Sequence, residues 1–246
     1  DDYMFKRVMR RKRLCKQLIE KILRIRIRDI RYLEEEKSIK ATYDSRGIRL
    51  DVYVADDKNT VFNVEMQVRP LPGFALFKRT RYYQSMIDVD LLVSGADYDT
   101  LNSTFVIFIC PFALFDGKRH IYTFRNLCVE DHALELNDGA TKIFLSTKGT
   151  LDDITPDVKA FLNYIDGISG HDAFVEDIEH TIQELKAQEA ERVSYMTFEM
   201  KMKEIHKEGR AEGENRVTAL GIIRQTDRAA ARSDQTASAA APFLFF

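Results

Sequence analysis

The chain has 246 residues, a formal net charge of −2 and 45% hydrophobic residues, with few glycines and prolines. This composition excludes a disordered or collagen-like chain, and the length suits one domain of moderate size with an appendage. The three cysteines, Cys15, Cys110 and Cys128, are far apart. Their spacing argues against a disulfide framework and predicts a reducing, cytoplasmic environment. The longest apolar run, residues 104–115, is shorter than the roughly 20 residues of a membrane span, so no membrane partner is expected.

Charge is distributed unevenly along the chain. Residues 1–84 carry a net charge of +9, residues 85–185 carry −12, and the remaining residues carry +1. Two interpretations of the basic segment are open. It is either the footprint of a polyanion such as nucleic acid, or a set of solvated helix and strand faces whose cations pair with the acidic segment.

Hydrophobic periodicity predicts the first elements. Apolar residues recur at helical spacing over residues 13–24, which predicts an amphipathic helix. Residues 48–54 alternate apolar and polar side chains, a polar turn follows at 56–59, and residues 61–68 alternate again. This pattern is typical of a β-hairpin whose two strands each have one buried face.

The later elements change in character along the chain. Pro70 and Pro72 punctuate the chain before the next helix, and residues 105–110 are continuously apolar, as expected of a strand covered on both faces. A charged segment over 173–214 predicts a long helix or a helical pair, and the composition becomes rich in Ala, Ser and Thr near the end. Further helices are expected at 74–92 and 158–165, and further strands at 120–124 and 142–145.

The hairpin places two acids opposite one another. If its loop is 56–60, Asp51 faces Glu65 and Arg49 faces Gln67 across the two strands. Opposed Cβ atoms of an antiparallel pair are about 4.5–5.5 Å apart, and two carboxylates at that distance repel unless one is protonated or a cation lies between them. Carboxylate and amide oxygens are the hard ligands that suit Mg²⁺ or Mn²⁺. The alternative is a solvated strand face whose acids point apart or pair with Arg49.

The hairpin also resembles a known active site. Gly-Ile-Arg-Leu-Asp-Val-Tyr-Val at 47–54, followed by Asn-Val-Glu-Met-Gln at 63–67, resembles the active-site hairpin of the PD-(D/E)XK nuclease superfamily. More narrowly it resembles the bacterial recombination-promoting nuclease and transposase family, as do the opening segment and the segments after the hairpin. The resemblance covers about residues 1–215. It implies an α/β fold, with a restriction-endonuclease-like mixed β-sheet flanked by helices and a charged helical C-terminal extension.

This resemblance assigns roles to the acids. It implies that Asp51 and Glu65 are catalytic and hold Mg²⁺, with Mn²⁺ as a second option, and that Glu20 adds a further metal ligand from a helix. A solvated surface Glu is the alternative for Glu20. Gln67 stands where the superfamily pattern has Lys, so a neutral amide replaces an ammonium that can orient water and stabilise developing charge. The Glu-x-Gln form nevertheless resembles the variant of this particular family.

The resemblance also implies DNA as the partner. Arg81 and Gln84 lie on the following helix, where similar nucleases place residues that orient phosphate, and ordinary helix surface is the alternative for both. Arg49 on the hairpin is a further candidate for contact with DNA. The implied activity is metal-dependent hydrolysis of DNA phosphodiester bonds by an endonuclease linked to recombination or transposition. The alternative function is a catalytically silent DNA-binding or assembly module on the same fold, which Gln67 in place of Lys favours.

Three parts of the chain are expected. They are a nuclease-like core at 1–170, a charged helical extension at 171–222 and a disordered or non-native tail at 223–246. Apolar residues on one face of the extension, Ile178, Ile182 and Leu185, are either a seam for a homo-oligomer or a surface that packs on its own domain.

Overall fold

A mixed six-stranded sheet lies at the centre of the first of two units, Asp1–Gln188; the second unit is Glu189–Phe246. The computed structural model describes residues 1–32, 37–40, 46–115, 117–188, 193 and 195–203. The strands are β1 (Ile30–Tyr32), β4 (Val52–Asp56), β5 (Val61–Met66), β6 (Thr104–Cys110), β7 (Ile121–Phe124) and β8 (Ala140–Ser146). Their order is β1-β4-β5-β6-β8-β7. The central strands β5, β6 and β8 are parallel, whereas β1, β4 and β7 pair antiparallel with their neighbours.

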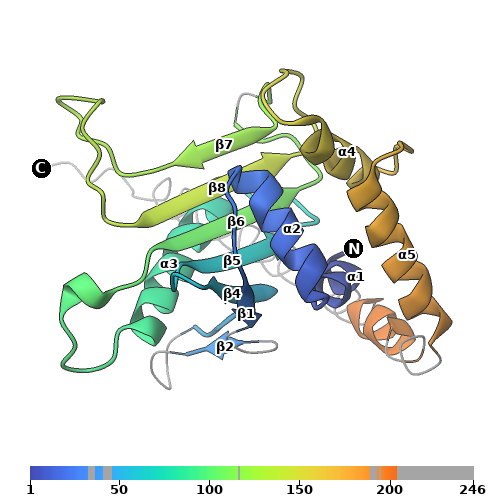
Figure 1. Cartoon of the computed structure of the whole chain (residues 1–246), viewed down its shortest axis with the longest axis horizontal. Helices are drawn as coiled ribbons and strands as arrows, with labels where there is room; N and C mark the ends of the chain where they lie inside the picture. The colour runs from blue at the N-terminus through green and yellow to red at the C-terminus, as the bar shows by residue number, and fades with distance from the viewer. Residues whose placement is uncertain (33–36, 41–45, 116, 189–192, 194, 204–246) are drawn as a thin grey trace, which may run out of the picture. The chain divides into compact units, whose positions relative to one another are not determined.

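Helices cover both faces of the sheet (Figure 1). One face packs against α1 (Asp2–Met9), α2 (Lys12–Leu23), α4 (Pro156–Ile165) and α5 (Ala173–Ala187), whose buried side chains form one core. The other face packs against α3 (Ala75–Leu91) and a second core. Two short strands, β2 (Ser38–Ile39) and β3 (Ile48–Arg49), form a separate small sheet, and a 3₁₀-helix, η1 (Tyr98–Thr100), precedes β6. This architecture confirms the predicted α/β class with its mixed sheet flanked by helices.

The hairpin register agrees with the sequence prediction. Val52 pairs with Val64 and Ala55 with Val61, which is the register that sets Asp51 opposite Glu65. The predicted strand over 48–54 is nevertheless interrupted, because β3 ends at Arg49 and β4 begins at Val52. Continuous alternation could not reveal this break.

Both faces of the hairpin are buried, which corrects the prediction of one solvated face. Every residue of β4 and β5 is buried, including the polar Asn63. Val52 and Val54 join the core under α1 and α2, whereas Tyr53 and Ala55 join the core under α3. Polar residues in these strands therefore lie inside the molecule.

The first unit extends beyond residue 170, where the nuclease-like core was expected to end. Ile178 and Leu185 of α5 are buried in the core that α1, α2 and α4 share. Of the two alternatives for this apolar stripe, packing on its own domain is the one that the structure supports. The tail expected at 223–246 lies outside the described residues, and so does most of the expected extension after Ala187.

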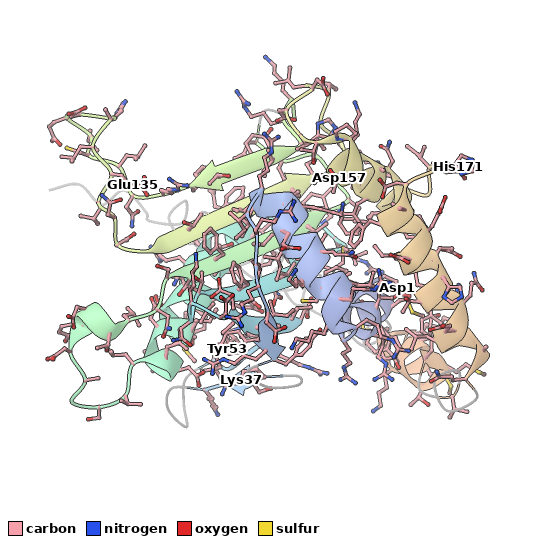
Figure 2. The ribbon with its side chains drawn as sticks, in the orientation of Figure 1. Asp1, Lys37, Tyr53, Glu135, Asp157 and His171 are labelled. Carbon is pink, nitrogen blue, oxygen red and sulfur yellow. The ribbon has the colours of Figure 1, made fainter. Side chains whose placement is uncertain are left out.

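Several cations of the basic segment pair with the acidic segment. Lys21 lies 2.7 Å from Asp157, and Arg13 lies 2.5 Å from Asp177 of α5. Figure 2 shows Asp157 at the start of α4. The structure thus supports the interpretation of mutual neutralisation for these residues rather than an open polyanion surface. Within the described residues, no helix is both long and apolar enough to cross a membrane.

Candidate active site

Asp51 and Glu65 meet at the edge of the sheet where β4 begins and β5 ends. In a regular antiparallel ladder the backbones of Asp51 and Glu65 would pair next. Here the backbone N–H groups bond to side-chain carboxylates instead. The Asp51 N–H donates to Glu65 Oε1 over 3.0 Å, and the Met66 N–H donates to Asp51 Oδ2 over 3.1 Å. Each carboxylate therefore has one oxygen held by the backbone of the opposite strand. This exchange explains the break between β3 and β4, because the bonds at Asp51 replace the regular ladder.

Two cations hold the other carboxylate oxygens. Lys6 Nζ of α1 lies 2.8 Å from Asp51 Oδ1, and Arg79 Nη2 of α3 lies 3.3 Å from Glu65 Oε2. The two helices cover opposite faces of the sheet, so the acids are reached from both sides (Figure 1). Each of the four carboxylate oxygens thus has a partner: two are held by backbone N–H groups, and two by the side chains of Lys6 and Arg79.

Burial makes this pair electrostatically costly. The Glu65 side chain is only 2% exposed, and burial together with the neighbouring Asp51 carboxylate raises the pKa of Glu65 to about 8. Burial also raises the pKa of Asp51, although Lys6 opposes that shift. Two neighbouring carboxyls whose pKa values are both raised are an arrangement that a bound cation would relieve.

Gln67 lies directly after β5, in contact with Arg79. Its N–H donates to the Ile109 carbonyl over 2.9 Å, which continues the pairing of β5 with β6. Its Oε1 accepts a hydrogen bond from Arg79 Nη1 over 2.7 Å. The Arg79 Nη2 atom also donates to the Tyr83 hydroxyl over 2.7 Å. The residue at the position of the missing lysine is therefore joined to a guanidinium.

Glu20 is not brought to this pair. Its Oε1 accepts hydrogen bonds from the Ile27 N–H over 2.8 Å and from Lys16 Nζ over 3.1 Å. Across the described part of the chain, no three His, Cys, Asp or Glu residues are grouped as metal ligands. The structure therefore holds Glu20 in local hydrogen bonds and does not group it with Asp51 and Glu65 as a third ligand; with 19% of its side chain exposed, it is not the solvated surface residue of the alternative either.

The three predicted DNA contacts differ in accessibility. Arg49 in β3 and Arg81 in α3 are exposed, so both stay available as predictions. Gln84 is buried, and its Nε2 donates to Asp88 Oδ1 over 2.9 Å. The prediction that Gln84 contacts DNA is thus corrected, because its side chain belongs to the interior side of α3.

Two site residues were missed by the sequence prediction. Lys6 was within the opening segment that carried the resemblance, but nothing in its spacing relates it to Asp51. Arg79 precedes Tyr83 by four residues and therefore shares a helix face with it, but this spacing does not relate Arg79 to the acids of the hairpin.

The donor set fits a hard divalent cation. Mg²⁺ is commonly bound through one or two carboxylates, with water and substrate phosphate completing its shell. Asp51 and Glu65 supply those two carboxylates, each already oriented by a backbone N–H. The raised pKa values of both acids are consistent with a site that gains stability when a positive ion is present.

Comparison with known proteins identifies the family. The family model described as PD-(D/E)XK nuclease family transposase matches residues 1–207. Comparisons with curated proteins and with solved structures give no match. PD-(D/E)XK nucleases generally use divalent metals, and a nuclease family implies a hydrolase with a DNA substrate. With the mixed sheet and the paired acids of its hairpin, the chain belongs to the family of PD-(D/E)XK nuclease family transposases.

Proposed function

We propose that this protein is a Mg²⁺-dependent DNA endonuclease that acts in recombination or transposition. The observation that carries the proposal is the pair of the buried Glu65 and the largely buried Asp51, whose side chain is 10% exposed, with one oxygen of each held by a backbone N–H across the hairpin. A structural role alone does not account for a buried carboxylate beside a second, largely buried one, because their repulsion and desolvation destabilise the fold. Family membership supplies the reaction class.

Each residue has a distinct task in this proposal. Asp51 and Glu65 hold the ion, and the backbone N–H groups of Asp51 and Met66 keep the carboxylates from rotating away. Bound Mg²⁺ would supply Lewis acidity and a bound water of lowered pKa. In the reaction served, a water oxygen bonds to phosphorus and one phosphorus–oxygen bond breaks. The leaving oxygen takes a proton, so the products are a phosphate monoester and a hydroxyl.

Lys6 holds Asp51 Oδ1, an oxygen of one of the two carboxylates that would hold the ion. Its ammonium is 2.8 Å from that oxygen, so it already compensates part of the negative charge at the position where a cation is needed. Mn²⁺ fits the same oxygen donors and is a practical probe ion.

The test is cleavage of supercoiled plasmid with Mg²⁺ or Mn²⁺, with and without EDTA. Asp51→Asn and Glu65→Gln should each lower the cleavage rate by about 10³-fold or more, since they remove a ligand from a site where the ion supplies most of the chemistry. Asp99→Asn is the matched control, because it removes an exposed acid of η1 and should leave the rate unchanged.

The alternative of a catalytically silent DNA-binding module makes the opposite predictions. In that case wild-type protein binds DNA with a steep salt dependence and does not cleave it under any metal condition. DNA binding would also be indifferent to EDTA and to Asp51→Asn. Absence of cleavage by folded wild-type protein at stoichiometric concentration would overturn the proposed function.

A further inference from the structure

An arginine from another element lies at the place where the hairpin lacks a lysine. Arg79 Nη1 is 2.7 Å from Gln67 Oε1, and Arg79 Nη2 is 3.3 Å from Glu65 Oε2. The guanidinium therefore bridges the two hairpin positions that flank Met66. It comes from α3, more than ten residues later in the sequence.

We infer that Arg79 supplies the positive charge that a lysine at position 67 would supply, and that Gln67 is the residue that positions it. This inference rests on the proposed function. In the reaction, Arg79 donates hydrogen bonds to a non-bridging oxygen of the scissile phosphate and stabilises the charge that develops there. Arg79 is thus a catalytic residue and Gln67 a positioning residue.

The surroundings hold the guanidinium in one place. Its carbon lies 4.7 Å from the centre of the Tyr83 ring and 5.5 Å from that of Phe108 on β6. The Tyr83 hydroxyl accepts a further hydrogen bond from Nη2. Two aromatic rings, a hydroxyl and an amide constrain the side chain more than a single ion pair would. Such preorganisation is what electrostatic stabilisation of a transition state requires.

The guanidinium also has the capacity to bind a ligand. Arginine carries five N–H donors, and the described residues accept three hydrogen bonds from Arg79, at Gln67, Glu65 and Tyr83. Its side chain is 32% exposed, whereas Glu65 beside it is almost fully buried. If Arg79 served only to neutralise Glu65, its side chain would not need to be accessible from solvent. Arginine matches phosphate oxygens through a planar fork of donors, so the remaining N–H groups suit a phosphodiester.

Lys6 is the other cation of the site, and its position argues against the same role. It binds Asp51 from α1, on the opposite face of the sheet, and no contact with Gln67 joins it to the position of the missing lysine. The experiment below therefore changes only residues 67 and 79, removing the positive charge from position 79 and then adding one at position 67.

The test exchanges the amide of Gln67 and the positive charge of Arg79 between the two positions. Arg79→Gln should lower kcat for plasmid nicking by about 10²–10³-fold, because one preorganised donor group is lost, while KM for DNA stays within a few fold. Adding Gln67→Lys to Arg79→Gln returns an ammonium to the strand and should restore at least about tenfold of the lost kcat. Lys78→Gln removes an exposed charge from the neighbouring residue of α3 and is the matched control.

Two further measurements separate charge from fold. Mn²⁺ binding measured by calorimetry should be retained in wild type, Arg79→Gln and the double variant, and the thermal midpoint of each variant should stay above the assay temperature. If Arg79→Gln does not fold, Arg79→Lys, which keeps the charge on α3, takes its place and should retain more kcat than a neutral residue would allow.

The outcomes distinguish this inference from the proposed function. Wild-type cleavage with an unchanged kcat in Arg79→Gln would overturn the role of Arg79 and leave the nuclease assignment intact. Failure of the double variant to recover kcat, with Mn²⁺ binding retained, would also overturn it. Folded wild-type protein that never cleaves DNA would overturn both.

Discussion

Glu65 is the acid of the pair whose pKa is raised to about 8, so its charge is costly to the fold when no cation is bound. Its carboxyl is buried beside Asp51, and its pKa is raised from 4.5 to about 8. A folded-state pKa above the unfolded value means that the folded protein binds an extra proton between those two pH values. The stabilisation from that proton is fully present below about pH 4.5 and is lost as the pH rises through about 8.

The first prediction follows from this loss of stability with rising pH. Without divalent ions, the wild-type thermal midpoint should fall between pH 5 and pH 8 more steeply than that of Glu65→Gln. At pH 8 Glu65→Gln should be more stable than wild type by on the order of 1–3 kcal/mol, since it removes a buried charge and keeps a hydrogen-bonding shape. Calorimetric unfolding checks this. Glu176→Gln, an exposed acid of α5, should change stability by less than about 0.5 kcal/mol. A wild-type midpoint that rises over this pH range would contradict the prediction.

At the residue scale, the acids were predictable and their cations were not. Asp51 and Glu65 follow from strand alternation and turn length, which are local properties. Arg79 and Lys6 depend on which faces of α1 and α3 pack over the end of the sheet. Two residues along an α-helix rotate a side chain by about 200°, so choosing Arg81 instead of Arg79 selects the opposite face.

At the scale of elements, the connection after β8 is fixed by a close approach. The His120 N–H, just before β7, donates to both oxygens of Asp153 at 3.2 Å, and its ring Nδ1 lies 3.0 Å from the same carboxylate. The chain between β8 and Asp153 folds back over this residue. A Cβ on Gly149 would lie 2.5 Å from the His120 backbone nitrogen, so only glycine fits there.

The second prediction concerns this glycine. Gly149→Ala should destabilise the protein by about 2–4 kcal/mol, because the backbone at position 149 or at Arg119 and His120 must move to relieve the clash. Urea denaturation measures the change. Gly170→Ala is the matched control, since a Cβ there meets no atom within 4 Å. It should be neutral or stabilising by up to about 1 kcal/mol. Equal stability of the two variants would show that the connection is not constrained.

The elements themselves were largely predictable from the sequence. The predicted helix over 74–92 corresponds to α3 at Ala75–Leu91, and the apolar run at 105–110 to β6. The break at Asp51 escaped prediction for a physical reason. Asp51 fits the alternating pattern, and only its tertiary bonds to Glu65 and Met66 draw the backbone out of the ladder.

At the scale of the whole first unit, α5 completes the core that covers one face of the sheet. Its charged composition favoured an appended extension, yet its apolar stripe packs on α1, α2 and α4. The many charged residues of a helix lie on its solvated face and say little about packing. Whether the helix joins the core depends on its narrower apolar face. Acidic residues of α4 and α5 also form ion pairs with basic residues of α2, and these contacts offset part of the charge asymmetry between the two segments.

The third prediction tests this closure. Ile178→Ala should destabilise the chain by about 2–4 kcal/mol, and the loss should appear in a single cooperative transition, because α5 shares one core with the other helices. Ile168→Ala, at a side chain that is 54% exposed, should cost less than about 0.5 kcal/mol. Loss of α5 helicity in a separate, earlier transition would mean that α5 is an independent extension after all.

The hydrogen bond between the Asp51 N–H and Glu65 Oε1 gives the molecule an internal reporter. An amide proton bonded to a carboxylate experiences a strong local field, which changes when that carboxylate is protonated or shares its charge with an ion. The amide resonance of Asp51 in a nitrogen–proton correlation spectrum therefore follows the state of Glu65 from one strand away. Its titration would read occupancy of the site without DNA and without turnover.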